Sequence, residues 1–300
     1  MTPRQPGLYD RAQAAEQRGN RQVRDLGERY RSHREHLTGA ILALAAQPEP
    51  EPDPGPDRGP PGPRLCLLGA GNANDVDLEA LAARFSEVHL VDIDPSALAR
   101  ALGRQSPATR TRLRTHAPLD LSGLYQQLER PRLPAIDALV EAGAAAVLGR
   151  LPPGFDLVVS CCVLSQMSWA LEHLGSGAPA PLATLEQALL RIHLRTLLGL
   201  VAPEGTALIA ADLVSSAAAP LEDLITAAGG DLRAVVDRLA AQRLAFTVCN
   251  PELIRLTLRR DPLLAGPAGF QSARIGDPWI WQGPKDLTYL VYPLALRRRA

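Results

Sequence analysis

The pattern of apolar and polar positions predicts alternating strands and helices from residue 64 onward. Short apolar runs occupy 64–68, 87–92, 112–117, 155–160 and 206–212. Runs of this length are typical of strands that are buried on both faces of a parallel sheet. Stretches with helical spacing lie between them, at 75–84, 95–103, 122–129, 134–147 and 181–200. Because strands and helices alternate, we expect a doubly wound, mostly parallel Rossmann-like α/β sheet.

The last section of the chain has a different pattern. Two helical stretches, 219–243 and 251–259, come before two runs rich in aromatic and β-branched residues, WIWQ (279–282) and LTYLVYPLAL (287–296). A GPKD turn joins the two runs. We therefore expect an antiparallel hairpin that closes the edge of the sheet.

The first 46 residues form an N-terminal helical extension. Apolar side chains follow a helical spacing at Val23, Leu26, Tyr30, Leu37, Ile41 and Leu44. This spacing predicts an amphipathic helix, preceded by a shorter one. Segment 47–63 alternates Pro with acidic residues and Gly, which predicts an extended linker before the main domain, 64–300. Ligands of open α/β sheets bind at the carboxyl ends of the strands, so we expect residues 1–46 to cover that edge as a lid.

Composition and charge narrow the classes of partner. The 300 residues include 32 basic and 32 acidic side chains, so the net charge gives no reason to expect nucleic acid or an acidic membrane. No apolar stretch is long enough to span a bilayer and the N-terminus lacks a leader, so we expect a cytoplasmic protein. The four cysteines show no CxxC spacing, and we expect reduced thiols and no metal site.

A glycine loop follows the first predicted strand. Gly69 and Gly71, in LCLLGAGNANDVDL, precede a helix that Asn74 or Asp75 could cap. Glycine lets the backbone approach a ligand closely, and a helix N-terminus offers free N–H groups. The loop alone is a weak signal, because a plain strand-to-helix turn has the same form.

An acidic residue at the end of the second predicted strand strengthens this interpretation. Asp92 lies 21 residues after Gly71, the position from which a carboxylate can accept hydrogen bonds from both ribose hydroxyls of a nucleoside. Asp94 is expected to cap the helix that begins at Pro95. The two motifs together predict a nucleoside-bearing ligand.

These pieces, in this order, resemble the class I S-adenosylmethionine (SAM)-dependent methyltransferases over roughly residues 64–298. The matching segments are LLGAGNAND, VHLVDIDP, APLDL, FDLVVSCCVLSQM, LVAPEGTALIAAD and the terminal hairpin. The resemblance implies SAM as the cofactor, with adenine near the residues after strand three and the methionine and substrate side at the end of strand four. The cofactor contacts that it implies are Gly69, Ala70, Gly71, Asn74, Asp92, Ile93, Asp120, Leu121, Ser160 and Cys161.

Two positions depart from the family pattern. Leu67 stands where the family often has an acidic residue, and Ala73 where it often has a third glycine. The first departure leaves the methionine moiety without its usual contact, for which Asn74 or Asp75 could substitute. An NAD-dependent oxidoreductase shares the glycine loop and the ribose acid, but the full GxGxxG is absent and the sheet is expected to end in a hairpin.

No catalytic base is assigned, because positioning alone can supply much of the acceleration of a methyl transfer. The side chains considered near the cofactor are Gln166, His173, Tyr9, Tyr30 and His33. His33 and His36 are nevertheless expected to be solvated or to pack on a helix, and His193 to lie on the helix before strand five. Cys161 and Cys162 invite comparison with RNA cytosine methyltransferases, whose nucleophile ends strand four. The Pro-Cys context and the D/N-P-P-Y/F tetrapeptide are both absent, so we expect inert thiols and a small-molecule or side-chain acceptor.

Two other classes of function stay open from the sequence. The first is a SAM-binding scaffold or sensor without catalysis, which fits the missing acidic residue before the glycine loop. The second is a partner-binding module, in which the N-terminal helix docks onto another protein.

Overall fold

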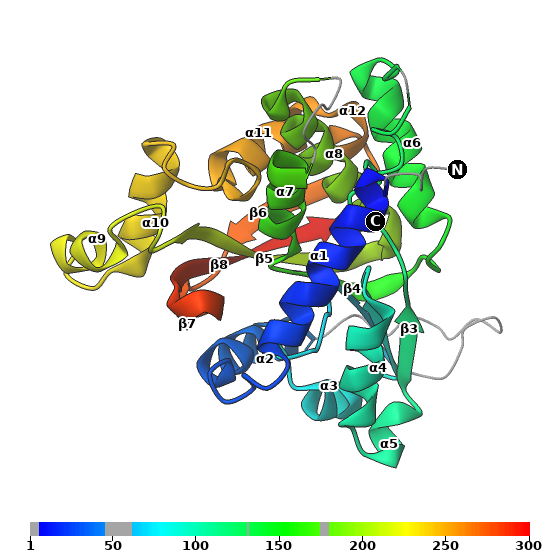
Figure 1. Ribbon diagram of the computed structural model, residues 1–300, viewed down its shortest axis with the longest axis vertical. Helices are drawn as coiled ribbons and strands as arrows, with labels where there is room; N and C mark the ends of the chain where they lie inside the picture. The colour runs from blue at the N-terminus through cyan, green and yellow to red at the C-terminus, as the bar shows by residue number, and fades with distance from the viewer. Residues whose placement is uncertain (1–5, 46–61, 131, 175–179) are drawn as a thin grey trace.

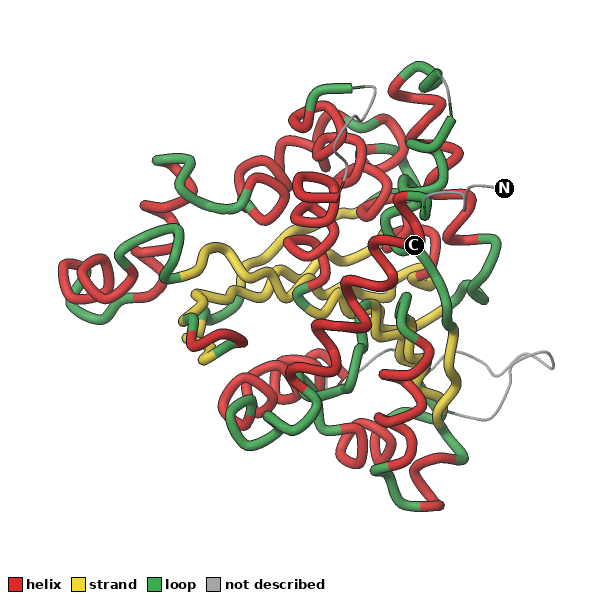
Figure 2. The backbone as a smooth tube through the Cα atoms, viewed as in Figure 1, coloured by secondary structure: helices red, strands yellow, loops and turns green. Residues whose placement is uncertain are grey.

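A computed structural model describes residues 6–45, 62–130, 132–174 and 180–300. Its centre is one eight-stranded sheet with helices on both faces (Figures 1 and 2). The strands are β1 (Arg64–Leu68), β2 (Glu87–Val91), β3 (Leu113–His116), β4 (Phe155–Cys161), β5 (Val201–Ser215), β6 (Phe270–Ile275), β7 (Trp279–Gln282) and β8 (Thr288–Arg298). The helices are α1 (Leu8–Val23), α2 (Arg31–Ala45), α3 (Leu78–Arg84), α4 (Pro95–Gly103), α5 (Pro107–Arg110), α6 (Ile136–Leu148), α7 (Val163–Leu174), α8 (Leu182–Leu200), α9 (Leu221–Ala227), α10 (Leu232–Ala241), α11 (Pro251–Arg260) and α12 (Pro262–Ala265).

The strand order confirms the expected Rossmann-like architecture. The strands run β3-β2-β1-β4-β5-β8-β6, and β1 to β5 pair in parallel. The expected hairpin of β7 and β8 is present, and β8 pairs antiparallel with β5 as well. The first five strands follow the order of dinucleotide-binding folds, but an antiparallel strand takes the next place, where those folds continue in parallel.

Both faces of the sheet are buried, which explains the continuous apolar runs. Along β1, Leu65 and Leu67 belong to one apolar core and Cys66 and Leu68 to the other. Side chains alternate between faces in a strand, so a strand that is covered on both sides has no solvent-facing position. One core lies under α6, α7 and α8, and the other under α2, α3 and α4 (Figure 1).

The structure corrects several predicted elements. Segment 122–129 consists of turns, because Asp120 accepts hydrogen bonds from the backbone N–H of Ser122 and of Tyr125. The predicted helix 219–243 is divided into α9 and α10 at Gly229 and Gly230, since glycine has a low helix propensity. α5, α7 and β6 are additional elements that the pattern of the sequence does not predict.

The N-terminal extension folds as two helices of similar length, not as a long helix after a shorter one. α1 has 16 residues and α2 has 15. α2 packs against α3 and β7, whereas α1 crosses in front of the sheet and contacts α4 and α7 (Figure 1). Most of the predicted linker 47–63 lies outside the described residues. Within the described part of the chain, no helix is long and apolar enough to cross a membrane.

Candidate functional site

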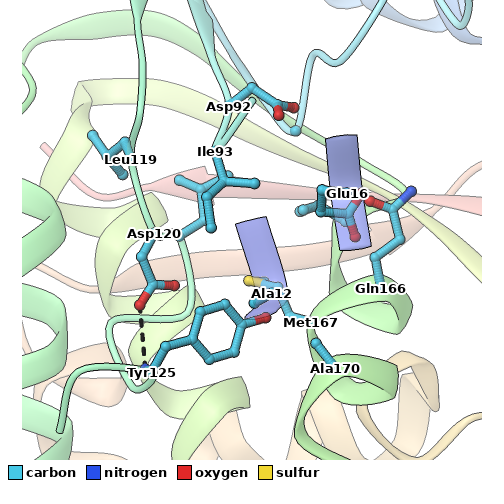
Figure 3. A pocket seen from close by; sticks show the side chains of 13 residues that line it. Ala12, Glu16, Asp92, Ile93, Leu119, Asp120, Tyr125, Gln166, Met167 and Ala170 are labelled. Carbon is cyan, nitrogen blue, oxygen red and sulfur yellow. Dashed lines mark hydrogen bonds between the residues drawn. The ribbon is translucent and has the colours of Figure 1, made fainter. Parts of the chain in front are cut away.

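A pocket opens where the carboxyl ends of β1, β2 and β4 meet α1 (Figure 3). Five predicted cofactor residues line it: Gly69, Asp92, Ile93, Asp120 and Leu121. The other lining residues are Ala12, Glu16, Leu119, Tyr125, Val163, Gln166, Met167 and Ala170. This edge is where open α/β sheets bind their ligands.

The glycine loop is folded tightly against the end of β2. Gly69 and Gly71 have φ of 75° and 47°, in the left-handed region that favours glycine. A Cβ on Gly69 would lie 2.7 Å from Cβ of Val163, so no side chain fits there. The backbone N–H of Gly71 donates to Oδ2 of Asp92 at 2.8 Å. The loop and the predicted ribose carboxylate therefore form one unit.

Asp92 keeps acceptor capacity toward the pocket. Its Oδ1 accepts the backbone N–H of Asp94 at 2.8 Å, so each carboxylate oxygen has one protein donor. The backbone N–H of Ile93 also acts on this carboxylate. An ionised carboxylate has about four acceptor positions, so acceptor capacity remains for a ligand. Burial raises the pKa of Asp92 to about 6, although its backbone donors oppose the shift. Asp94 accepts the backbone N–H of Ser96 and caps α4, as predicted.

Asp120 lies across the pocket from Glu16 and Gln166 (Figure 3). Its carboxylate holds the turn after β3 through the backbone N–H groups of Ser122 and Tyr125, at 2.8 and 3.2 Å. Burial raises its pKa, and these hydrogen bonds oppose the shift. Apolar side chains of Ile93, Leu119 and Leu121 lie beside it, which gives this end of the pocket a surface suited to a flat base.

Charge distinguishes this pocket from a phosphate site. Glu16, Asp92 and Asp120 line it, and no Arg, Lys or His is among the lining residues. Burial raises the pKa of Glu16 to about 7, and the carboxylates of Asp92 and Asp94 add to the shift. Sequence reasoning missed Glu16, because only the tertiary contact of α1 with the sheet brings it here.

Polar contacts hold α1 over the pocket. Nε2 of Gln13 donates to the carbonyl of Ile93 at 3.0 Å, and Nδ2 of Asn20 donates to Oδ2 of Asp94 at 3.1 Å. Nδ2 of Asn72 donates to the carbonyl of Asn20 at 2.7 Å. These contacts place the N-terminal helix on the carboxyl edge of the sheet.

Five of the predicted cofactor residues do not line the pocket: Ala70, Gly71, Asn74, Ser160 and Cys161. Nδ2 of Asn74 instead donates to the carbonyl of Val23 at 2.9 Å, so Asn74 holds the end of α1. Oγ of Ser160 lies 2.9 Å from Nε2 of His193, and both side chains are fully buried. Ala70 and Cys161 pack in the apolar core. Gly71 acts on the pocket indirectly, because its backbone N–H holds the carboxylate of Asp92.

Neither Asn74 nor Asp75 caps the helix after the glycine loop. Asp77 caps α3 by accepting the backbone N–H of Ala80. Oδ1 of Asp75 lies 3.4 Å from Nε2 of His33 on α2, and Asp75 does not line the pocket. Asn74 and Asp75 are thus both committed to the N-terminal helices.

Among the side chains considered for catalysis, only Gln166 lines the pocket. His33 is buried and stacks on Trp281, which also contacts Tyr30. His173 stacks on Trp169 at the far end of α7. Tyr9 is half-buried against the apolar core. No acid–base pair is formed at the pocket by these groups.

The cysteines are expected to be inert. All four are free and buried, and burial raises the pKa of both Cys161 and Cys162 well above the usual value of a thiol. Since the thiolate is the reactive form, iodoacetamide at pH 8 should leave the native protein largely unlabelled, whereas unfolded protein takes up four labels. Intact-protein mass spectrometry measures both states. Rapid native labelling of Cys161 or Cys162 would contradict this expectation and revive a covalent mechanism.

Comparison with known proteins gives structural likenesses only. No family model matches the chain, and no curated protein matches it. The methyltransferase domain of bacterial CtHen1-C is 14% identical, with 90% of this chain and 100% of that chain covered and a TM-score of 0.43. The CurJ carbon methyltransferase is also 14% identical, with 89% of this chain and 54% of that chain covered and a TM-score of 0.42. The O-methyltransferase TomG from Streptomyces achromogenes, in complex with SAM, is 14% identical, with 78% of this chain and 72% of that chain covered and a TM-score of 0.33. The chain spans about half the length of the CurJ chain. Because these TM-scores lie below 0.5, we base the functional proposal on the residues of the pocket.

Proposed function

We propose that this chain is a SAM-dependent methyltransferase that acts on a small molecule or a protein side chain. The observation that carries the proposal is the pocket with three carboxylates and no cationic side chain at the carboxyl edge of a Rossmann-like sheet. SAM bears two cationic centres, a sulfonium and an α-ammonium, against one α-carboxylate, and its ribose has two hydroxyl donors. Carboxylates that are buried, as Asp92 is, or half-buried, as Glu16 and Asp120 are, favour a ligand with net positive charge, because uncompensated charge away from water is costly.

The residues present fit the nucleoside part of SAM. Asp92 lines the pocket and keeps acceptor capacity for the ribose hydroxyls, and Gly69 beside it has no room for a side chain. Ile93 and Leu121 would flank the adenine, beside Asp120. When bound, SAM supplies an electrophilic methyl group for in-line displacement by the acceptor. The chain's part is to bind, orient and exclude water, which accounts for much of the acceleration in such reactions.

The same pocket disfavours NAD. In dinucleotide-binding folds the pyrophosphate lies on the helix N-terminus directly after the glycine loop. Here α3 begins at Leu78, and its N-terminus is already occupied by the side chain of Asp77. The backbone N–H of Asp77 donates to Oγ1 of Thr38 at 3.0 Å. A pyrophosphate would meet carboxylates in place of donors.

The acidic character of the pocket also indicates which class of methyl acceptor it favours. The phosphate backbone of a nucleic acid requires cationic contacts for affinity. Glu16, Asp92 and Asp120 give the opposite sign, and the chain as a whole is neutral. This favours a small-molecule or side-chain acceptor over RNA or DNA.

The test of this function begins with the ligand that copurifies with the protein, identified by mass spectrometry. We expect SAM or S-adenosylhomocysteine (SAH), and calorimetric titration should show binding of SAH and none of NAD. A bound nicotinamide nucleotide would overturn the proposal. Transfer of labelled methyl from SAM to a component of cell extract then distinguishes an enzyme from a SAM-binding scaffold, for which label stays on SAM.

A further inference from the structure

The position that usually contacts the methionine moiety has no acidic side chain in this chain. Leu67 stands there, and it is fully buried in the apolar core. The two nearby polar candidates also point elsewhere, since Asn74 holds the end of α1 and Asp75 faces His33. The glycine-loop segment therefore provides no carboxylate for the ammonium group of a bound amino acid.

Glu16 of α1 brings a carboxylate to the same pocket from outside the sheet. It lines the pocket together with Gly69 and Gln166, and Figure 3 shows it on the side opposite to Asp120. In the same view Asp92 lies above both residues, at a horizontal position between them. This order matches the order of chemical groups in SAM, in which the ribose lies between the base and the amino acid.

We propose that Glu16 binds the α-ammonium group of the methionine moiety, and that α1 thereby completes the cofactor site. The assignment rests on the proposed function. Among the described residues, no hydrogen-bond donor is directed at the Glu16 carboxylate, and the charges that act on it are those of Asp92 and Asp94. A half-buried carboxylate without a donor and beside other carboxylates favours a cationic ligand, and a charge-assisted hydrogen bond to an ammonium group satisfies this preference.

The position of Glu16 is held from both sides along α1. Gln13 is bonded to the carbonyl of Ile93, and Asn20 to Asp94. Both partners lie just after β2, next to the predicted ribose carboxylate. The carboxylate of Glu16 is thus presented by a helix that is anchored at the site, which limits the entropy lost on binding.

The experiment compares two ligands that differ only at the amino acid. SAH carries the ammonium group, whereas 5′-methylthioadenosine keeps the adenine, ribose and sulfur but lacks it. Calorimetry with the full chain should show that Glu16→Gln weakens SAH binding about tenfold or more and changes 5′-methylthioadenosine binding less than about twofold. Glu28→Gln is the matched control, because it makes the same change on a side chain that is 80% exposed.

The pH dependence provides a second readout. Glu16 must be ionised to bind the ammonium group, and its pKa is raised by burial and by Asp92 and Asp94 to about 7. The ratio of SAH to 5′-methylthioadenosine affinity should therefore rise as pH increases from 5.5 to 7.5, and stay flat in Glu16→Gln. The other ionisable groups facing Glu16 are Asp92, Asp94, Asp120 and Tyr125, with Arg100 near Asp94. Asp92 and Asp120 are assigned to the nucleoside part, which both ligands share, so their direct contacts with the ligand cancel in the ratio.

The outcomes separate the two proposals. If the wild-type protein binds neither ligand, the cofactor assignment fails and the role of Glu16 fails with it. If wild type binds both and Glu16→Gln binds SAH equally well, or loses both ligands equally, only the role of Glu16 is overturned. Selective loss of SAH binding in Glu16→Gln, with Glu28→Gln unchanged, supports it.

Discussion

Asp92→Ala is expected to weaken SAH binding by one to two orders of magnitude. The carboxylate accepts from Gly71 and from Asp94, and it offers its remaining acceptor positions to the pocket. A hydrogen bond to a charged group contributes about 1.5–3 kcal/mol, which corresponds to about 10- to 100-fold in affinity. Because the ribose is common to both ligands, 5′-methylthioadenosine should lose about as much affinity as SAH, in contrast to the selective effect expected for Glu16→Gln.

The matched control is Asp94→Ala. Asp94 is completely buried, caps α4 and accepts a hydrogen bond from Asn20, but it does not line the pocket. Loss of a helix cap costs about 1 kcal/mol of stability, so this variant should show a lower melting temperature and a much smaller loss of SAH affinity. Equal SAH affinity of wild type and folded Asp92→Ala would remove the ribose assignment and much of the case for a nucleoside cofactor.

Local pattern was sufficient to predict the parallel sheet, the position of Asp92 at the pocket and the cap by Asp94. Strands buried on both faces have continuous apolar runs, so β1, β2 and β4 were found within one residue of their ends. Asp92 and Asp94 could be told apart because their positions relative to the strand end and to Pro95 differ. Such inferences need only the chemistry of neighbouring residues in the chain.

Contacts between residues far apart in the chain explain why the roles of Asn74 and Glu16 could not be predicted from the sequence. Asn74 looks like a residue of the cofactor loop, yet its donor is used by Val23 at the end of α1, 51 residues away. Glu16 has no motif around it, and only the packing of α1 between α4 and α7 brings it to the pocket. The turn after β3 was mistaken for a helix, because its apolar spacing is helical while Asp120 holds its backbone.

Residues predicted from local pattern and residues placed by long-range contacts line the same pocket. Asp92 and the glycine loop come from the sheet, whereas Glu16 and Ala12 come from the extension before the predicted linker. The extension is therefore more than a docking element for another protein, since its buried face is used within this chain. This arrangement makes cofactor binding and the position of α1 dependent on each other.

Removal of residues 1–24 is accordingly expected to weaken SAH binding by about 100-fold, because it deletes the proposed charge-assisted contact and also opens the pocket to water. For 5′-methylthioadenosine, which lacks the ammonium group, we expect a smaller loss of about tenfold, from the lost enclosure alone. Calorimetric titration of both ligands measures the two losses. Only Leu8 and Ala12 of α1 are buried, so the rest of the domain should keep its fold, which thermal unfolding would verify.

A variant that loosens α1 without deleting it tests the same coupling. Gln13→Ala combined with Asn20→Ala removes the side-chain hydrogen bonds to Ile93 and to Asp94 but retains Glu16. We expect an SAH affinity between those of wild type and the truncated protein, because Glu16 is present but less firmly positioned. Saturating SAH should slow proteolysis within α1 of this variant, and 5′-methylthioadenosine should do so less. Full SAH affinity in the truncated protein would show that α1 neither contacts nor encloses the cofactor.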